Sequence, residues 1–110
     1  MIAWDDFMKI DMRVGTITSV FDFPIARKPA YQLSIDFGCL GIKRSSAQIT
    51  ALYPKEELIG KQVIAVINFP PKQIANFYSE CLVLGVYNED KEVVLLQPNR
   101  PVKNGSRIGW

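Results

Sequence analysis

The sequence predicts an all-β fold, a small closed barrel of five or six short strands. Apolar side chains occupy every second position from Tyr31 to Phe37, and this alternation is typical of a strand with one buried face. Three later runs are short, nearly continuously apolar and rich in β-branched residues, which favours buried strands over helices: 61–67, 81–87 and 93–96. Helical features are confined to short segments at the N-terminus and near 54–59.

The first half of the chain supplies three of these strands. A helical turn opens it over residues 4–10, where apolar side chains fall at i, i+3 and i+4 and two acids lie in the first turn. A strand follows over 12–21, and its apolar parity changes near Gly15, so we expect a bulge or bend at this glycine. The strand at 31–37 is followed by a more polar one at 42–49.

The second half begins with the short helical segment. Pro54 lies near its start, acids follow in its first turn, and Gly60 lies at its end. Pro70 and Pro71 stop the strand at 61–67 and stiffen the connection that follows, since proline fixes φ and donates no hydrogen bond. Residues 88–91 form the turn between the last two strands. This order, with a helix between the third and fourth strands, is that of the OB-fold, a five-stranded Greek-key barrel.

Length and composition fit one domain over residues 1–110. No apolar run approaches the roughly 20 residues that span a bilayer, and the N-terminus lacks the basic region of a signal peptide. We therefore expect a cytoplasmic protein without membrane insertion. Cys39 and Cys81 are far apart in sequence, which favours reduced structural thiols over a disulfide or a redox pair.

The chain contains no histidine, which removes Ser-His-Asp and Cys-His nucleophile activation and every zinc site that needs histidine. Two cysteines cannot form a Cys₄ site. The acids are scattered at the N-terminus and beside turn signals, where solvated carboxylates are usual. We expect no catalytic residues, no metal and no cofactor.

The two ends of the chain carry opposite charge, although the net charge is only +2. Residues 1–11 are mostly acidic and residues 98–110 are basic, so the ends could meet within one subunit or across a two-fold axis. Two tryptophans near the ends exceed what a small barrel easily buries, and exposed apolar patches often mark interfaces. The predicted dimer interface comprises Trp4, Phe7, Met8, Ile108 and Trp110. Packing of these side chains against the barrel base is the alternative.

Several blocks of the sequence also resemble a known family. Residues 7–17 (FMKIDMRVGTI) are similar to the opening of the tRNA-binding OB domain, and 68–74 (NFPPKQI), followed by Ser79, is similar to its second block. Further blocks resemble the export-related chaperone family CsaA, a stand-alone branch of that superfamily: 35–38, 43–50, 82–85 and 93–98. The similarity extends from about residue 6 to residue 109.

This resemblance implies a homodimer that binds exposed peptide segments of unfolded preproteins and cooperates with the export ATPase SecA. The wider superfamily implies binding of tRNA. Lys72 stands where the tRNA-binding proteins tend to have arginine, Asn76 replaces a loop glycine, and Cys81-Leu82 replaces a Gly-Met pair. These differences disfavour close approach of RNA and leave peptide binding intact.

The candidate residues for peptide or RNA contact lie near the two prolines, on the polar strand or at the end of the alternating strand: Phe37, Lys43, Arg44, Ser45, Ser46, Asn68, Phe69, Pro70, Pro71, Lys72, Phe77, Tyr78 and Ser79. Three alternatives stay open. The aromatic residues could instead cap the open end of the barrel, the cations could simply be solvated, and the Ser and Asn side chains could bond to their own chain.

The function that the sequence predicts is passive holding of unfolded segments. No GxxxxGK[ST] loop is present, so the energy for export would come from a partner. The alternative is an RNA-binding module, with affinity that falls steeply with salt. An enzyme is the least favoured class, because the residues for common catalytic arrangements are missing.

Overall fold

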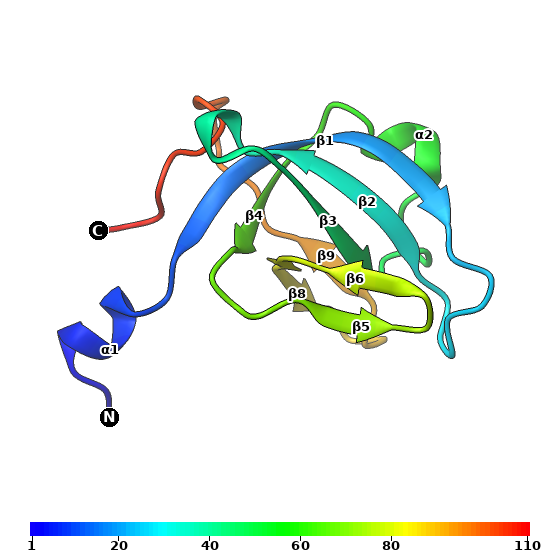
Figure 1. Cartoon of the computed structure of the whole chain (residues 1–110), viewed down its shortest axis with the longest axis horizontal. Coiled ribbons are helices and arrows are strands. Elements are labelled where there is room, and N and C mark those ends of the chain that lie inside the picture. Colours follow the sequence, from blue (N-terminus) through cyan, green and yellow to red (C-terminus); the bar gives the residue numbers. More distant parts are fainter.

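The computed structural model describes residues 1–110, and its centre is the long strand β1 (Met12–Asp22). The C-terminal part of β1 pairs with β2 (Tyr31–Asp36), and its N-terminal part pairs with β4 (Gln62–Val66). Strand β3 (Ile42–Ala47) continues the antiparallel sheet beyond β2, and β7 (Leu82–Val83) continues it beyond β4. Figure 1 shows this sheet curling into a nearly closed barrel, which confirms the predicted all-β fold of the OB type.

The barrel closes along a seam between β3 and residues 79–81. The Glu80 N–H donates to the Arg44 carbonyl over 2.7 Å, and the Arg44 N–H donates to the Glu80 Oε1 over 2.9 Å. The Ser46 N–H donates to the Ser79 hydroxyl over 3.1 Å. Side chains therefore complete a junction in which a single backbone hydrogen bond runs directly between the two segments.

Two hairpins extend from the sheet. Strands β5 (Lys72–Ile74) and β6 (Phe77–Ser79) form one, within a region that we expected to be an irregular loop. Strands β8 (Gly85–Tyr87) and β9 (Val93–Leu95) form the other, joined by the predicted turn at 88–91. The strand expected over 81–87 is divided at Leu84, because β7 pairs with β4 whereas β8 pairs with β9.

Both predicted helical segments are present. Helix α1 (Trp4–Met8) stands away from the barrel in Figure 1, on the side where the C-terminus also lies. Helix α2 (Lys55–Leu58) inserts the fully buried Leu58 into the core. The connection between β2 and β3 contains a 3₁₀ turn, η1 (Gly38–Leu40), where the two glycines at 38 and 41 predict a turn. None of the helices is long and apolar enough to cross a membrane.

The main core lies inside the barrel, where the inward-facing side chains of the strands meet that of Leu58. Its largest fully buried members are Phe37, Ile17, Leu33, Ile35, Leu58 and Val63. Gly15 faces this core, and a Cβ at that position would lie 2.6 Å from the Ile35 side chain and 2.8 Å from that of Phe37. The prediction of a bulge at Gly15 is wrong: the register shifts between Ile17 and Ser19, and the glycine makes room for core side chains instead.

The oppositely charged ends meet within one chain. The tail (residues 98–110) runs beside the start of β1, where the Val14 N–H donates to the Ser106 carbonyl and the Ile108 N–H donates to the Met12 carbonyl, each over 2.9 Å. The Arg107 guanidinium lies 3.9 Å from the Asp11 carboxylate. The tail thus pairs with the N-terminal part of β1, along the same edge on which β2 pairs with the C-terminal part.

The two cysteines are free thiols with different surroundings, as expected for reduced structural residues. Cys39 is exposed, whereas Cys81 is buried beneath the seam, and this burial raises the pKa of the Cys81 thiol to about 11. Folding therefore favours the neutral thiol. The stability that this preference contributes is fully present below pH 9 and is lost as the pH rises toward 11.

We predict that only one thiol reacts with a chromogenic disulfide reagent in the native protein at pH 8. Cys39 should react rapidly, and Cys81 should react only after unfolding in guanidinium chloride, because it is both buried and protonated. The Cys39→Ser variant is the control and should show no rapid phase. Two rapid equivalents in the native protein would contradict the burial of Cys81.

Candidate functional site

The segment between β4 and β5 (residues 67–71, here called the binding loop) carries the most exposed candidate residues. The side chain of Phe69 is 56% exposed, as is that of Tyr78 on the neighbouring strand β6. Pro70 and Pro71 are exposed between them, and they restrict the backbone that carries Phe69. The loop therefore presents apolar groups that have little conformational freedom to lose on binding.

Asn68 fixes the start of this loop. Its Oδ1 accepts a hydrogen bond from the Asp11 N–H over 3.0 Å, and its Nδ2 donates to the Lys9 carbonyl over 2.7 Å. The backbone continues the attachment, since the Ile67 N–H donates to the Asp11 carbonyl. The Asn68 side chain therefore bonds to its own chain, which was the alternative to ligand contact for the Ser and Asn residues. These bonds position the loop.

Phe77 supports the surface from beneath. Its ring is 2% exposed and lies 5.4 Å from the ring of Phe23, centroid to centroid. The guanidinium carbon of Arg44 lies 4.4 Å from the Phe77 centroid, which is cation–π geometry. Phe77 therefore covers the end of the barrel, one of the two alternatives for the aromatic residues, and holds Arg44 at the surface.

Three candidate contact residues are buried, and a ligand cannot reach them in this structure. Phe37 follows β2 directly and is 0% exposed, because it fills the core beside Gly15. Ser45 faces inward on β3 and donates its hydroxyl to the Cys81 carbonyl over 3.1 Å. With Phe77, these residues are corrections to the expected site, because each is used in packing or closing the barrel.

Ser79 and Ser46 also serve the seam. The Ser79 hydroxyl accepts from the Ser46 N–H and donates to the Cys81 carbonyl, so its bonding capacity is used within the chain. Both side chains are half-buried. The structure thus brings the exposed residues Phe69, Pro70, Pro71, Lys72 and Tyr78 together on one hairpin and its leading loop.

We give the name cationic rim to five cations on the elements next to this hairpin, namely two in the β1–β2 loop, two on β3 and one on β5: Arg27, Lys28, Lys43, Arg44 and Lys72. The first two were not among the predicted site residues. They belong to the β1–β2 loop, which packs on the β5–β6 hairpin through an apolar cluster of Phe23, Ala30 and Phe77. The sequence shows two adjacent cations between Pro24 and Pro29. It does not show that they lie near the hairpin, because this proximity depends on tertiary packing.

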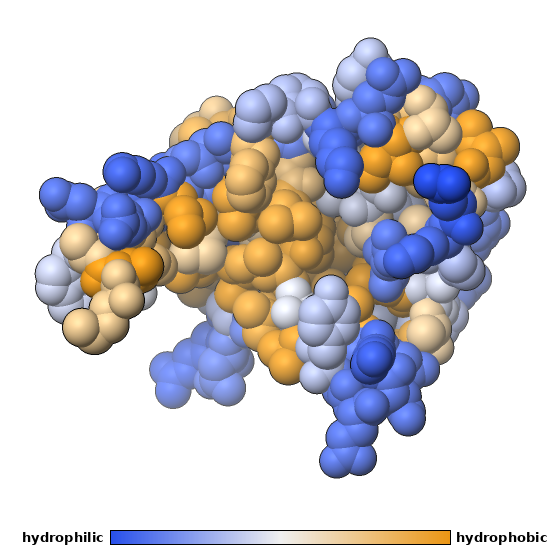
Figure 2. Space-filling view, turned by 90° about the horizontal axis from the view of Figure 1, so that it is seen from below, coloured by the Kyte–Doolittle hydropathy of each residue, from blue (hydrophilic) through white to orange (hydrophobic).

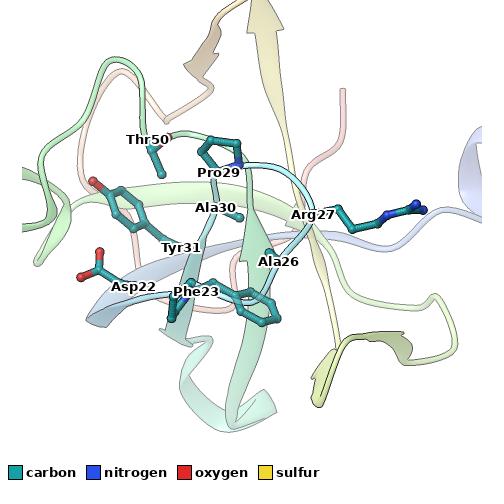
Figure 3. A pocket seen from close by; sticks show the side chains of 9 residues that line it. Asp22, Phe23, Ala26, Arg27, Pro29, Ala30, Tyr31 and Thr50 are labelled. Carbon is teal, nitrogen blue, oxygen red and sulfur yellow. The ribbon is translucent and has the colours of Figure 1, made fainter.

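A shallow hollow of about 460 Å³ opens at the base of the same loop. Figure 3 shows Arg27 directed away from Asp22, with Phe23 between them and Tyr31 on the same side as Asp22. Asp22 accepts a hydrogen bond from Lys55 over 2.8 Å, and this bond raises the pKa of the Lys55 ammonium. No group of three or more cysteine, aspartate or glutamate side chains lies close enough to hold a metal ion.

The arm (residues 1–10, including α1) carries an exposed aromatic cluster. The ring of Trp110 lies 5.2 Å from that of Trp4 and 5.6 Å from that of Phe7. Trp4 remains 72% exposed and Trp110 79% exposed. The tryptophans therefore pack on each other rather than being buried against the barrel base.

A second apolar surface lies on the outer side of β7, β8 and β9. Leu82 is 48% exposed and Val86 is 54% exposed, whereas Cys81 and Val83 on either side of Leu82 pack into the core. Val94 pairs with Val86 across the β8–β9 hairpin, and it is also exposed, as is Leu96. In the view from below (Figure 2), a wide apolar area lies beside the arm, on the side where Figure 1 places β8.

Comparisons with known proteins agree with this architecture. Residues 12–107 match the family described as "Putative tRNA binding domain". The crystal structure of the CsaA chaperone protein from Picrophilus torridus superposes with a TM-score of 0.93 at 57% identity, covering 99% of this chain and 100% of that one. The structure of chaperone CsaA from Bacillus anthracis superposes with a TM-score of 0.94 at 54% identity, covering 99% of each chain.

A methionine–tRNA ligase of Bacteroides fragilis is 38% identical over 107 residues, which are 97% of this chain. They are only 16% of the ligase, so the chain spans about a sixth of such a relative. The fold and the exposed surface thus define a small OB barrel of the kind that stands alone or is attached to a larger protein. The chain belongs to the tRNA-binding domain family, in its CsaA chaperone branch.

We predict that Asn68→Ala loosens the arm. The substitution leaves the Asp11 N–H and the Lys9 carbonyl without their side-chain partners, so the free energy of unfolding should fall by about 1–2 kcal/mol. Limited proteolysis should cut near the arm faster than in the unmodified chain. Asn76→Ala, at the exposed tip of the β5–β6 hairpin, is the matched control. Equal cleavage rates in the two variants would contradict the positioning role of Asn68.

Proposed function

We propose that the protein is a passive, non-enzymatic chaperone that holds exposed apolar segments of unfolded preproteins. The observation that carries this proposal is the preordered surface of Phe69 and Tyr78, each 56% exposed on backbone that is restricted by two prolines and anchored by Asn68. Large aromatic side chains supply most of the contact energy at such surfaces. The similarity to CsaA chaperones supports the same function.

The residues of this surface are suited to binding a partner and not to catalysis. The exposed groups of the surface are aromatic rings, proline rings and cations, and the hydroxyls of Ser46 and Ser79 lie at the seam. The sequence contains no P-loop, so holding would be independent of ATP. By the family resemblance, the export ATPase SecA would accept the held preprotein and supply the energy for transport.

We further propose that the protein acts as a homodimer. The exposed aromatic cluster of the arm supports this arrangement, together with the half-exposed Met8 and the neighbouring Ile108. The apolar surface of β7–β9 continues beside the arm and enlarges the area that a second copy would cover. A dimer would offer two equivalent binding surfaces, and one long unfolded chain could then engage both with increased avidity.

RNA binding is the second candidate function. The β1–β2 loop and the long β4–β7 connection are the regions with which OB-folds commonly contact oligonucleotides, and here they carry the cationic rim. Phe69 and Tyr78 could stack on unpaired bases. This candidate is supported by the match to the tRNA-binding domain family.

A paired titration separates the two functions. Fluorescence anisotropy would follow a labelled unfolded peptide and a labelled tRNA at two salt concentrations. We expect peptide binding that changes little with salt and weakens about tenfold or more in Phe69→Ala, because truncation of a central aromatic residue costs about 1–3 kcal/mol. Ile59→Ala removes a side chain of the same exposed fraction near α2 and should bind normally. Salt-steep tRNA binding without peptide binding would overturn the chaperone proposal.

Analytical ultracentrifugation tests the dimer. We expect a concentration-dependent dimer in the unmodified chain and a dissociation constant at least tenfold higher in Trp110→Ala, because this ring contacts both Trp4 and Phe7. Ile25→Ala, an exposed apolar residue of the β1–β2 loop, is the control and should dimerise normally. A dimer unaffected by Trp110→Ala would exclude the arm from the interface.

A further inference from the structure

We infer that the cationic rim makes the protein selective for client segments in which an apolar stretch is flanked on one side by acidic residues. This inference rests on the proposed chaperone function and adds the class of client. None of the five rim cations forms an ion pair within the chain; the ion pairs of the structure involve Lys9, Arg13, Lys55 and Arg107 instead. Their charges are therefore available to a partner.

Arg44 is the most fixed member of the rim. Its guanidinium lies over the buried Phe77 ring, and its backbone N–H and carbonyl are both bonded to Glu80 across the seam. The stacked side chain is partly ordered before a ligand arrives, and the donors of a guanidinium suit a carboxylate well. Arg44 thus presents a prepared anion contact at the start of β6, over the Phe77 ring that precedes the exposed Tyr78 in the chain.

Arg27 and Lys28 extend the rim from the other side. Both are exposed on the β1–β2 loop, and the packing of Phe23 against Phe77 holds that loop to the hairpin. In Figure 3 the Arg27 side chain points away from the hollow at the base of the loop, into the surroundings of the molecule. The β1–β2 loop and Arg44 of β3 thus both adjoin Phe77, so two of the elements around this ring carry cations.

The acids of the chain do not neutralise this end. Asp22 at the end of β1 is paired with Lys55. Glu80 is the one carboxylate at the seam, where its Oε1 accepts the Arg44 N–H, and its single negative charge is opposed by five rim cations. The remaining acids lie on the arm or directly after it, near η1, on α2 or in the β8–β9 turn: Asp5, Asp6, Asp11, Asp36, Glu56, Glu57, Glu89, Asp90 and Glu92. The net charge of only +2 thus hides a strongly cationic end.

The surface is divided by chemistry, and this division favours a peptide over RNA. Phe69, Pro70 and Pro71 form an apolar part, and Lys72 is the cation next to it. The other rim cations belong to the β1–β2 loop and to β3. A nucleic acid would need charge along its whole path, because every nucleotide carries a phosphate. An apolar segment with acids at one end would match the division.

The test uses three labelled peptides with the same apolar core and with glutamate, glutamine or lysine residues at one flank. Because each exposed ion pair contributes only about 0.2–1 kcal/mol, we expect the rim as a whole to favour the glutamate peptide over the glutamine peptide about tenfold. The lysine peptide should bind more weakly than the glutamine peptide. The preference should decrease at high salt, since exposed charges are screened.

The double variant Arg27→Gln/Lys28→Gln should reduce the glutamate preference to about threefold or less, without weakening the glutamine peptide. Arg100→Gln/Lys103→Gln removes the same charge from the exposed tail and is the matched control. It should keep the full preference. Both variants change exposed side chains without intramolecular partners, and thermal unfolding would verify that they remain folded.

The outcomes separate this inference from the proposed function. Equal binding of the glutamate and glutamine peptides would overturn the selectivity and leave the chaperone function standing. A preference that persists in the Arg27/Lys28 variant would overturn the role of the rim. Binding of none of the peptides would overturn both proposals. Salt-steep tRNA binding that is lost in the Arg27/Lys28 variant, without a glutamate preference, would assign the rim to RNA instead.

Discussion

Closure of the barrel at the seam is the constraint on which the rest of the structure depends. Strand β3 is an edge of the five-stranded sheet, and an open edge exposes backbone groups that must find partners. Ser79 and Glu80 meet this need with a hydroxyl and a carboxylate as well as a backbone N–H. The barrel can therefore close although the facing segment is too irregular to form a regular ladder. Beneath the seam, Cys81 and Ser45 complete the core side of the junction.

The binding surface is a consequence of this closure. The segment that closes the barrel is the end of strand β6, so the β5–β6 hairpin must stand at the rim beside β3. Arg44 is then carried to the Phe77 ring by the same pairing that seals the sheet. Asn68 anchors the other end of the connection at the arm. Stability and recognition thus use neighbouring residues of one segment: the polar side chains and Phe77 close the barrel, whereas the rings of Phe69 and Tyr78 are exposed.

The sequence was sufficient for the fold and insufficient for the details of the site. Two-residue alternation at 31–37 and the short apolar runs predicted the sheet, because burial of one face leaves a direct periodic trace. The β5–β6 hairpin was missed since its strands have three residues each, too few for a periodic signal, and two prolines precede them. Gly15 was interpreted as a bulge because a glycine in a strand has the same local appearance whether it bends the chain or admits a neighbour.

The candidate site shows the same limit at the level of side chains. Phe69 and Phe77 have similar local sequence surroundings, yet one is 56% exposed and the other 2%. Their difference arises from Phe23, which is distant in sequence and covers only the second ring. Likewise, Ser45 looked available on a polar strand, but the inward face of that strand is closed by a carbonyl from residue 81. In each case, contacts with residues distant in sequence determine whether the side chain is exposed. Such contacts leave no local sequence pattern.

The pairing of the tail with β1 has a consequence for how the chain is made. Residues 12–14 emerge from the ribosome well before their hydrogen-bonding neighbours at 105–108. Until then, one edge of the N-terminal part of β1 has no partner, and the Trp4 ring has no Trp110 to stack on. Such a contact has nearly the longest sequence separation the chain allows, so it is expected to form late. The arm would then acquire its final position only after residues 105–110 have been synthesised.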